Sequence, residues 1–137
     1  MRHVFTSLLL VVLLFAAVSL GDAVTWNDLV KRDGVYRRKD SDVPFTGKTE
    51  GAIQVSFRNG KPHGLWVVYY ENGYLRTKGA YKDGKKEGPW FTYWRNGQLW
   101  YKGIWKDGKK DGPWVGYYEN GQLSWKETYK NDKKLSE

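Results

Sequence analysis

Hydrophobic and polar positions along the chain recur with a period of 24 residues. Successive segments, the last one truncated, read FRNGKPHGLWVVYYENGYLRTKGA, YKDGKKEGPWFTYWRNGQLWYKGI, WKDGKKDGPWVGYYENGQLSWKET and YKNDKKLSE. Runs rich in Trp, Tyr, Val and Thr alternate with clusters of Gly, Asn, Asp and Lys, so the pattern predicts short strands joined by turns. A fixed period of this length indicates a repeat array. The predicted fold class is all-β: an antiparallel meander that grows by one β-hairpin per repeat.

Each repeat carries two turn signals. Asn-Gly pairs occur at residues 72–73, 96–97 and 120–121. We predict two-residue type I′ hairpin turns there, because Asn and Gly both tolerate the positive φ that this turn requires. The second signal is a lysine-rich segment at residues 82–86, with a copy at 106–110. We predict a longer turn for it.

Counting outward from the Asn-Gly turns gives a strand register. It predicts a buried face of aromatic rings and leucines, on which a glycine opposite an indole lets the ring lie across the backbone. The predicted pairs on this face are Trp66 with Gly79, Trp90 with Gly103, Trp114 with Glu127, Trp125 with Gly116, and residues 70, 94 and 118 with Leu75, Leu99 and Leu123.

The opposite face carries three tyrosines, Tyr69, Tyr93 and Tyr117, among lysines. We predict that this face is amphipathic and exposed to solvent. The tyrosines are candidate contacts for a protein partner, since aromatic side chains are enriched in such interfaces. The alternatives are that the tyrosines only cover the sheet, or that they stack on sugar rings.

The first part of the chain does not keep the 24-residue period. Residues 24–56 are predicted to form an N-terminal cap with a degenerate first hairpin, followed by the repeat array at 57–137. Thr25 and Asp28 resemble a capping box, and Gly34 is a candidate helix end, so we expect a helix of one or two turns between them.

Residues 1–23 have the pattern of a secretory signal peptide. Arg2 and His3 begin a short basic segment, an unbroken apolar run covers residues 8–18, and small residues follow. We expect cleavage near Gly21 to Ala23 and a secreted or periplasmic protein. Because a membrane-spanning helix needs about 20 apolar residues, no transmembrane helix is expected in the mature chain.

Composition narrows the chemistry of the chain. It has no cysteine and 2 histidines, which excludes disulfides, thiolate zinc sites, cysteine nucleophiles and a histidine-rich metal centre. Aromatic residues make up 17% of the chain, although its mean hydropathy is -0.71. This combination argues against disorder and against an ordinary aliphatic core.

We predict no catalytic, cofactor-binding or metal-binding residue. His63 lacks the nucleophile or paired carboxylate that a catalytic base needs, and it occupies a turn position held by an acidic residue in later repeats. The acidic residues at 83, 87, 107 and 111 alternate with lysines that would repel calcium, so we assign them to turn chemistry.

The formal net charge of +8 is concentrated in the lysine-rich turns. Equivalent lysines should lie about 10 Å apart along one edge of the sheet. Such an edge is a candidate contact for anionic lipid or an envelope polymer, and the alternative is that it only keeps the turns soluble. Nucleic acid is not an expected partner of an exported protein. The candidate residues are Lys82, Lys85, Lys86, Lys106, Lys109, Lys110, Lys130, Lys133 and Lys134.

The segments KDGKKEGPWFTYWRNGQL and KDGKKDGPWVGYYENGQL resemble the bacterial variant of the MORN repeat, found in proteins labelled as antitoxins of the YwqK type. The preceding VPFTGKTEG resembles a lead-in to such repeats. The resemblance implies a single-layer sheet of MORN-type hairpins and a role in binding rather than catalysis, with protein or phospholipid as the ligand. We therefore expect a non-catalytic, exported protein-binding scaffold, and an antitoxin-like neutraliser of a partner protein is an alternative.

Overall fold

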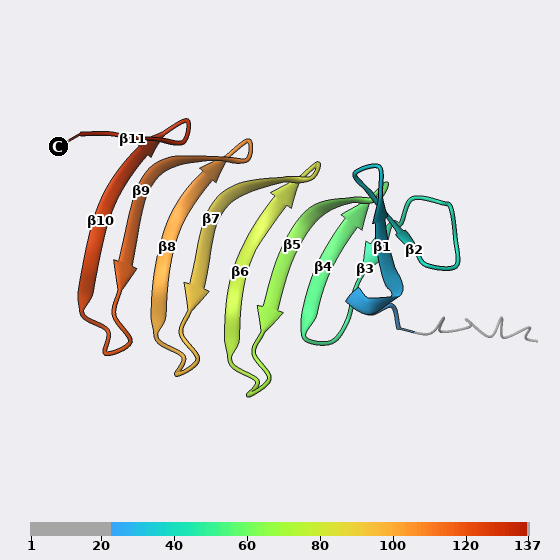
Figure 1. The fold of residues 1–137 in the computed structure, drawn as a ribbon, viewed down its shortest axis with the longest axis horizontal. Coiled ribbons are helices and arrows are strands. Elements are labelled where there is room, and N and C mark those ends of the chain that lie inside the picture. The colour runs from blue at the N-terminus through green and yellow to red at the C-terminus, as the bar shows by residue number, and fades with distance from the viewer. Residues whose placement is uncertain (1–22, 137) are drawn as a thin grey trace, which may run out of the picture.

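The computed structural model describes residues 23–136, whose regular structure is almost entirely β-strand (Figure 1). Within this range, nine strands form one antiparallel sheet in the order β11-β10-β9-β8-β7-β6-β5-β4-β3, and β1 and β2 form a separate hairpin. The prediction of a single-layer antiparallel meander is confirmed. Apart from Ala23, the predicted signal peptide lies outside the described residues. The elements are η1 (Trp26–Asp28), β1 (Leu29–Arg32), β2 (Val35–Arg38), β3 (Gly47–Lys48), β4 (Ile53–Arg58), β5 (Lys61–Tyr69), β6 (Leu75–Lys82), β7 (Lys85–Tyr93), β8 (Leu99–Lys106), β9 (Lys109–Tyr117), β10 (Leu123–Lys130) and β11 (Lys133–Lys134).

The two turns of each repeat have geometries opposite to those predicted. Asp83 and Gly84, in the lysine-rich turn, have φ angles of 48° and 83°, as a two-residue type I′ turn requires. In the Asn-Gly turn, Asn72 has a negative φ, Gly73 has a φ of 85°, and the Gly73 N–H donates to the carbonyl of Tyr70 at 3.0 Å. This is a type I turn followed by a glycine in the left-handed region. The predicted turn types are wrong because Asp and Asn both tolerate positive φ, so the dipeptide alone does not select the turn.

The Asn-Gly turns are hydrogen-bonded from one hairpin to the next. Asn72 Nδ2 donates to the carbonyl of Arg95 at 3.0 Å, and Asn96 Nδ2 donates to the carbonyl of Glu119 at 2.9 Å. Aromatic side chains before the turns make parallel bonds: Tyr70 Oη donates to the carbonyl of Tyr93 at 2.6 Å, and Trp94 Nε1 donates to the carbonyl of Tyr117 at 3.1 Å. The asparagines therefore fix the spacing of the turns rather than supply positive φ.

The leucines do not pair as predicted. A bulge at the Asn-Gly end of each hairpin shifts the register by one residue, which exchanges the two faces of a strand. The observed pairs are Leu75 with Tyr69, Leu99 with Tyr93 and Leu123 with Tyr117, in place of residues 70, 94 and 118. Leu123, at the end of the array, is 51% exposed. The prediction of a combined tryptophan and leucine layer is therefore wrong for the leucines.

The tryptophan register is as predicted, with Trp66 opposite Gly79 and Trp90 opposite Gly103. The rings that cover these glycines, however, come from the following strands. Trp90 of β7 lies over Gly79, and Trp114 of β9 lies over Gly103. Both of these indoles are buried, at 4% and 3% exposed, whereas Trp66 is half-buried. Each tryptophan therefore fastens one hairpin to the hairpin before it.

At the lysine-rich turns, one side chain in each repeat accepts a hydrogen bond from the backbone of the following turn. The acceptor is the imidazole of His63 in the first regular repeat and a carboxylate in the next two. The pairs are His63 Nδ1 with Asp83 N–H (3.1 Å), Glu87 Oε2 with Asp107 N–H (2.8 Å), and the Asp111 carboxylate with Asn131 N–H. The histidine and the acidic residues therefore have a structural role, because each accepts a hydrogen bond from the backbone of a turn.

The N-terminal cap contains less helix than predicted. Only the single 3-10 turn η1 forms, and the Thr25 N–H donates to Asp28 Oδ2 at 2.7 Å as a capping box requires. The chain then enters the β1–β2 hairpin, where Asp33 and Gly34 form a turn with φ angles of 51° and 77°. Gly34 is therefore a hairpin residue and not a helix end.

The hydrophobic core lies where this cap meets the sheet. Leu29 of β1 packs with Val55 and Phe57 of β4, and all three side chains are buried. Further side chains pack around them: Val24, Trp26, Tyr36, Phe45, Ile53 and Trp66. Figure 1 shows the cap at one end of the row of strands. In the part of the chain that the structure describes, no element covers β6 to β10, so both faces of these strands are open to ligands.

Candidate functional site: the aromatic–lysine face

One face of the sheet carries an extended series of aromatic rings. They come from matching positions of successive hairpins, because residues 24 apart occupy equivalent places two strands further on. Neighbouring ring centroids lie 5.1 to 6.2 Å apart, which is contact distance for aromatic pairs. We define the aromatic–lysine face by Trp66, Tyr81, Trp90, Tyr101, Trp105, Trp114, Trp125 and Tyr129, together with Lys86 and Lys110.

Two lysines lie between these rings. Lys86 Nζ is 4.4 Å from the ring centroid of Trp90 and 4.6 Å from that of Trp105. The equivalent distances one repeat later are 4.4 Å from Lys110 Nζ to Trp114 and 4.7 Å to Tyr129. Each ammonium therefore makes two cation–π contacts, each worth about 0.5 to 2 kcal/mol depending on how well the charge is shielded from water.

The surroundings of Lys86 disfavour its positive charge. Burial among the rings lowers the pKa of Lys86, and the nearby charge of Lys110 lowers it further. Burial also raises the pKa of the Tyr81 hydroxyl on the same face. A bound anion would offset both the desolvation and the mutual repulsion of the two ammonium groups.

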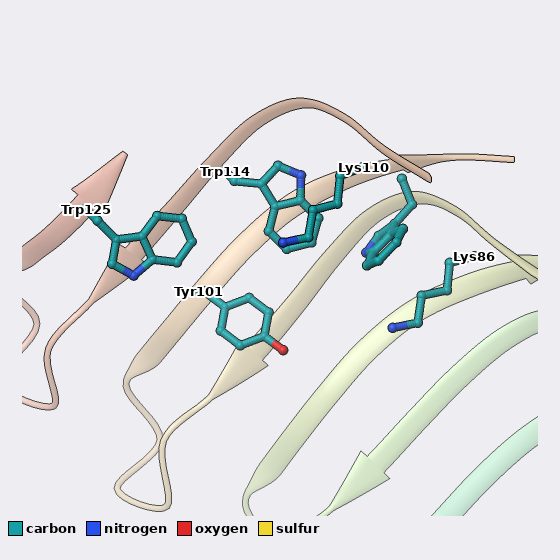
Figure 2. A pocket seen from close by; sticks show the side chains of 6 residues that line it. Lys86, Tyr101, Lys110, Trp114 and Trp125 are labelled. Carbon is teal, nitrogen blue, oxygen red and sulfur yellow. The ribbon is translucent and has the colours of Figure 1, made fainter. Parts of the chain in front are cut away.

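A hollow of about 220 Å³ opens on this face beside the two lysines. Figure 2 shows the labelled side chains gathered on one side of the sheet, with both lysines next to aromatic rings. The hollow is lined by Lys86, Tyr101, Trp105, Lys110, Trp114 and Trp125. Trp125 is 36% exposed, so an aromatic surface remains accessible there.

The structure divides the nine candidate lysines into separate groups. Lys86 and Lys110 turn onto the aromatic–lysine face, as described above. Lys130 Nζ is 3.0 Å from Asp111 Oδ2, and Lys134 Nζ is 2.7 Å from Glu127 Oε1. The others are exposed beside the type I′ turns: Lys82, Lys85, Lys106, Lys109 and Lys133. The sequence held a signal for this division, since adjacent strand residues such as Lys85 and Lys86 point to opposite faces.

The opposite face, which we call the tyrosine face, is more apolar than predicted. Tyr69 is 36% exposed, while Tyr93 and Tyr117 are half-buried. Directly opposed residues form a row across the strands that alternates apolar side chains with lysines: Val67, Lys78, Phe91, Lys102, Val115 and Lys126. Beside this row a hollow of about 270 Å³ is lined mainly by proline, phenylalanine, isoleucine and valine. Sequence reasoning missed this apolar strip because the lysines dominate the pattern.

Among residues 23–136, no three His, Asp or Glu side chains are grouped so as to hold a metal ion. The same range contains no helix that is long and apolar enough to cross a membrane.

Comparison with protein families assigns the regular repeats. Three consecutive segments, residues 62–83, 86–107 and 110–131, match the family model described as MORN repeat variant. Each segment begins at the second residue of the strand that follows a type I′ turn and ends at the next such turn. MORN repeats commonly serve in binding or scaffolding and are generally non-catalytic. A search of curated proteins found no match to the sequence.

Proposed function

We propose that the chain is an exported, non-catalytic binding module that holds a partner protein on its tyrosine face. The observation that supports this is the uncovered apolar strip on β7 to β9, with a lysine between its apolar side chains. Apolar patches rimmed by polar groups on an exposed surface mark sites of protein interaction. The tyrosines beside the strip are of the residue type enriched in such interfaces.

The repeat architecture suits a scaffold because it fixes the strip before a partner arrives. Hydrogen bonds join successive hairpins at both ends of their strands. Buried indoles join successive hairpins between those edges. A preorganised surface loses little conformational entropy on binding, so more of the contact energy is available for affinity.

Crosslinking and pull-down of the full chain from the cell envelope tests this proposal. We expect one or more envelope proteins to be enriched, and the enrichment to fall when Tyr69 and Tyr117 are both replaced by alanine. Tyr74→Ala is the matched control, because Tyr74 is 54% exposed but lies in a hairpin loop away from the strip. Absence of any protein above background, or equal loss with the control, would contradict the proposal.

The exposed lysines of the turns support a second candidate function, attachment to anionic lipid. Lys82 pairs with Lys85 across one type I′ turn, and the same pairing recurs at the next two turns. A lysine near a charged bilayer contributes about 1 kcal/mol, and salt screens the attraction. Co-sedimentation with phosphatidylglycerol vesicles should show binding that weakens as salt is raised. No binding at low salt, or binding indifferent to salt, would exclude it.

Export is the part of the proposal that rests on the sequence pattern of residues 1–23. Expression in a bacterial host followed by N-terminal sequencing should recover a chain that starts close to Ala23, outside the cytoplasm. Recovery of an uncleaved chain in the cytoplasm would instead favour an antitoxin-like neutraliser acting there on a partner protein.

A further inference from the structure

We propose that the hollow on the aromatic–lysine face binds acidic sugar units of a linear polysaccharide. This site lies on the face opposite the one assigned to a protein partner, so it is a second binding activity and stands independently of the first. The proposal rests on the shape of the hollow, on the type of group that lines it, and on its repetition along the array.

The hollow admits recognition through side chains only. It lies over β7 to β10, and β7, β8 and β9 are hydrogen-bonded to strands on both sides. Their backbone N–H and carbonyl groups are therefore occupied, and an extended peptide cannot add to the sheet at this place. What faces the ligand is a set of flat rings with two ammonium groups between them.

The rings provide apolar surfaces of the shape that a pyranose ring can stack on. Trp105, Trp125 and Tyr101 line the hollow and are not fully buried. The volume of about 220 Å³ is below the range of about 300 to 1,000 Å³ that is usual for drug-sized ligands. The hollow therefore has room for one small ring, and the rest of a long ligand must run along the open face.

The two lysines require that this ring be acidic. Lys86 forms no ion pair within the described residues, and its nearest aromatic neighbours bring no negative charge. Glu127 lies near Lys110, but its two oxygens are already engaged by Lys134 Nζ at 2.7 Å and by the Tyr129 hydroxyl at 2.5 Å. A ligand carboxylate beside each lysine would supply the missing anion.

Repetition favours a polymer over a single sugar. Lys86 and Lys110 occupy equivalent positions one repeat apart, and each lies between two rings. Two strands at about 4.8 Å spacing separate such positions. A linear polysaccharide with regularly placed carboxylates presents the same chemistry at intervals along its length.

Calorimetric titration with polygalacturonate tests the proposal on the full chain. We expect saturable binding, and a much weaker signal with the methyl-esterified polymer, which keeps the sugar rings but loses the carboxylate charge. Lys86→Met and Lys110→Met should each weaken binding on the order of tenfold, because each removes one charge-assisted contact. Lys85→Met and Lys109→Met remove the same charge from exposed neighbours and should bind as the parent does.

Thermal melting of the four variants shows whether a loss of binding reflects a loss of folding. Binding is compared among the variants whose melting temperature equals that of the parent. The proposal would be overturned if the control variants at Lys85 and Lys109 weakened binding as much as the variants at Lys86 and Lys110, since the effect would then reflect net charge alone. Equal binding of the methyl ester would also overturn it, as would equally tight binding of polyglutamate or phosphatidylglycerol vesicles through the same lysines. The pull-down with the tyrosine-face variants and the polysaccharide titration test different faces. Either proposal can therefore fail while the other stands.

Discussion

The indole of Trp90 lies flat across Gly79 on the neighbouring strand. A Cβ added at Gly79 would be 2.3 Å from two atoms of the indole, closer than side chains ever approach. Trp90 Nε1 also donates to the carbonyl of Ala80 at 3.2 Å, which fixes the ring over the glycine. Trp114 and Gly103 repeat the arrangement one repeat later. The packing of the Trp90 ring thus requires that residue 79 have no side chain.

Gly79→Ala should destabilise the array even though alanine suits a strand better than glycine. The added methyl must displace the Trp90 ring or the backbone, and overpacking of this kind costs about 1 to 3 kcal/mol. Urea unfolding measures the loss. In the double variant with Trp90→Ala the clash is absent, so the alanine at 79 should cost far less there. Additive losses would show that the two residues are not coupled.

Trp90→Ala should lower the free energy of unfolding by about 3 to 5 kcal/mol, since it removes a buried ring and leaves a cavity. The matched control is Trp100→Ala. Trp100 is 39% exposed and stacks on Trp94 at a centroid distance of 4.4 Å, so its loss should cost clearly less. Equal losses in denaturant titrations of the two variants would mean that the burial of Trp90 does not stabilise the array.

Much of this architecture follows from the sequence because the repeats report it several times over. The pairing of Trp125 with Gly116 is an example, since a large ring opposite the smallest residue fixes both register and face. The structure confirms it, with a Cβ at Gly116 falling 2.2 Å from the indole. Independent copies of one pattern allow such a register to be checked within a single chain.

The turn types and the position of Lys86 could not be predicted from the sequence, because both depend on contacts between hairpins. Asp83-Gly84 and Asn72-Gly73 are almost equivalent as dipeptides, but their turns make different long-range hydrogen bonds: Asn72 Nδ2 donates to the following hairpin, whereas the Asp83 N–H donates to His63 of the preceding hairpin. The candidate site likewise depends on contacts between strands that a local pattern does not reveal. Parity along β7 relates Lys86 to the face of Trp90, but its place between two rings requires the ring of a neighbouring strand, Trp105. Pairwise local patterns cannot supply that third partner.

Asn96→Asp should destabilise the array by about 1 kcal/mol. The change keeps the Oδ1 acceptor that receives the Gln98 N–H at 2.9 Å, but it removes the Nδ2 donor to the carbonyl of Glu119. Asn120→Asp is the control, because among residues 23–136 Asn120 Nδ2 bonds only within its own turn, to Gln122 Oε1 at 3.3 Å. Thermal melting compares the two variants. If Asn120→Asp costs as much as Asn96→Asp, the bond between hairpins does not stabilise the array.

The ion pair between Arg58 and Asp83 predicts a specific pH dependence. Arg58 Nη2 donates to Asp83 Oδ1 at 2.7 Å, and this hydrogen bond is the main reason that the pKa of Asp83 lies below its ordinary value of 3.8. A carboxylate whose folded pKa is depressed stabilises the fold above its unfolded pKa, and the contribution is lost as pH falls through the folded pKa. Arg58→Met should therefore be less stable than the parent at neutral pH.

The difference between parent and Arg58→Met should shrink as unfolding is measured at successive pH values below 3.8, because Asp83 becomes protonated in both proteins. Arg95→Met serves as the control. The guanidinium of Arg95 lies 5.3 Å from the ring centroid of Tyr70 and does not depend on a carboxylate there, so its effect should stay constant over the same range. A difference for Arg58→Met that persists unchanged below the folded pKa of Asp83 would mean that Arg58 stabilises the fold by packing alone. Both partners are largely exposed, so added salt should also reduce the difference at neutral pH, as it does for other surface ion pairs.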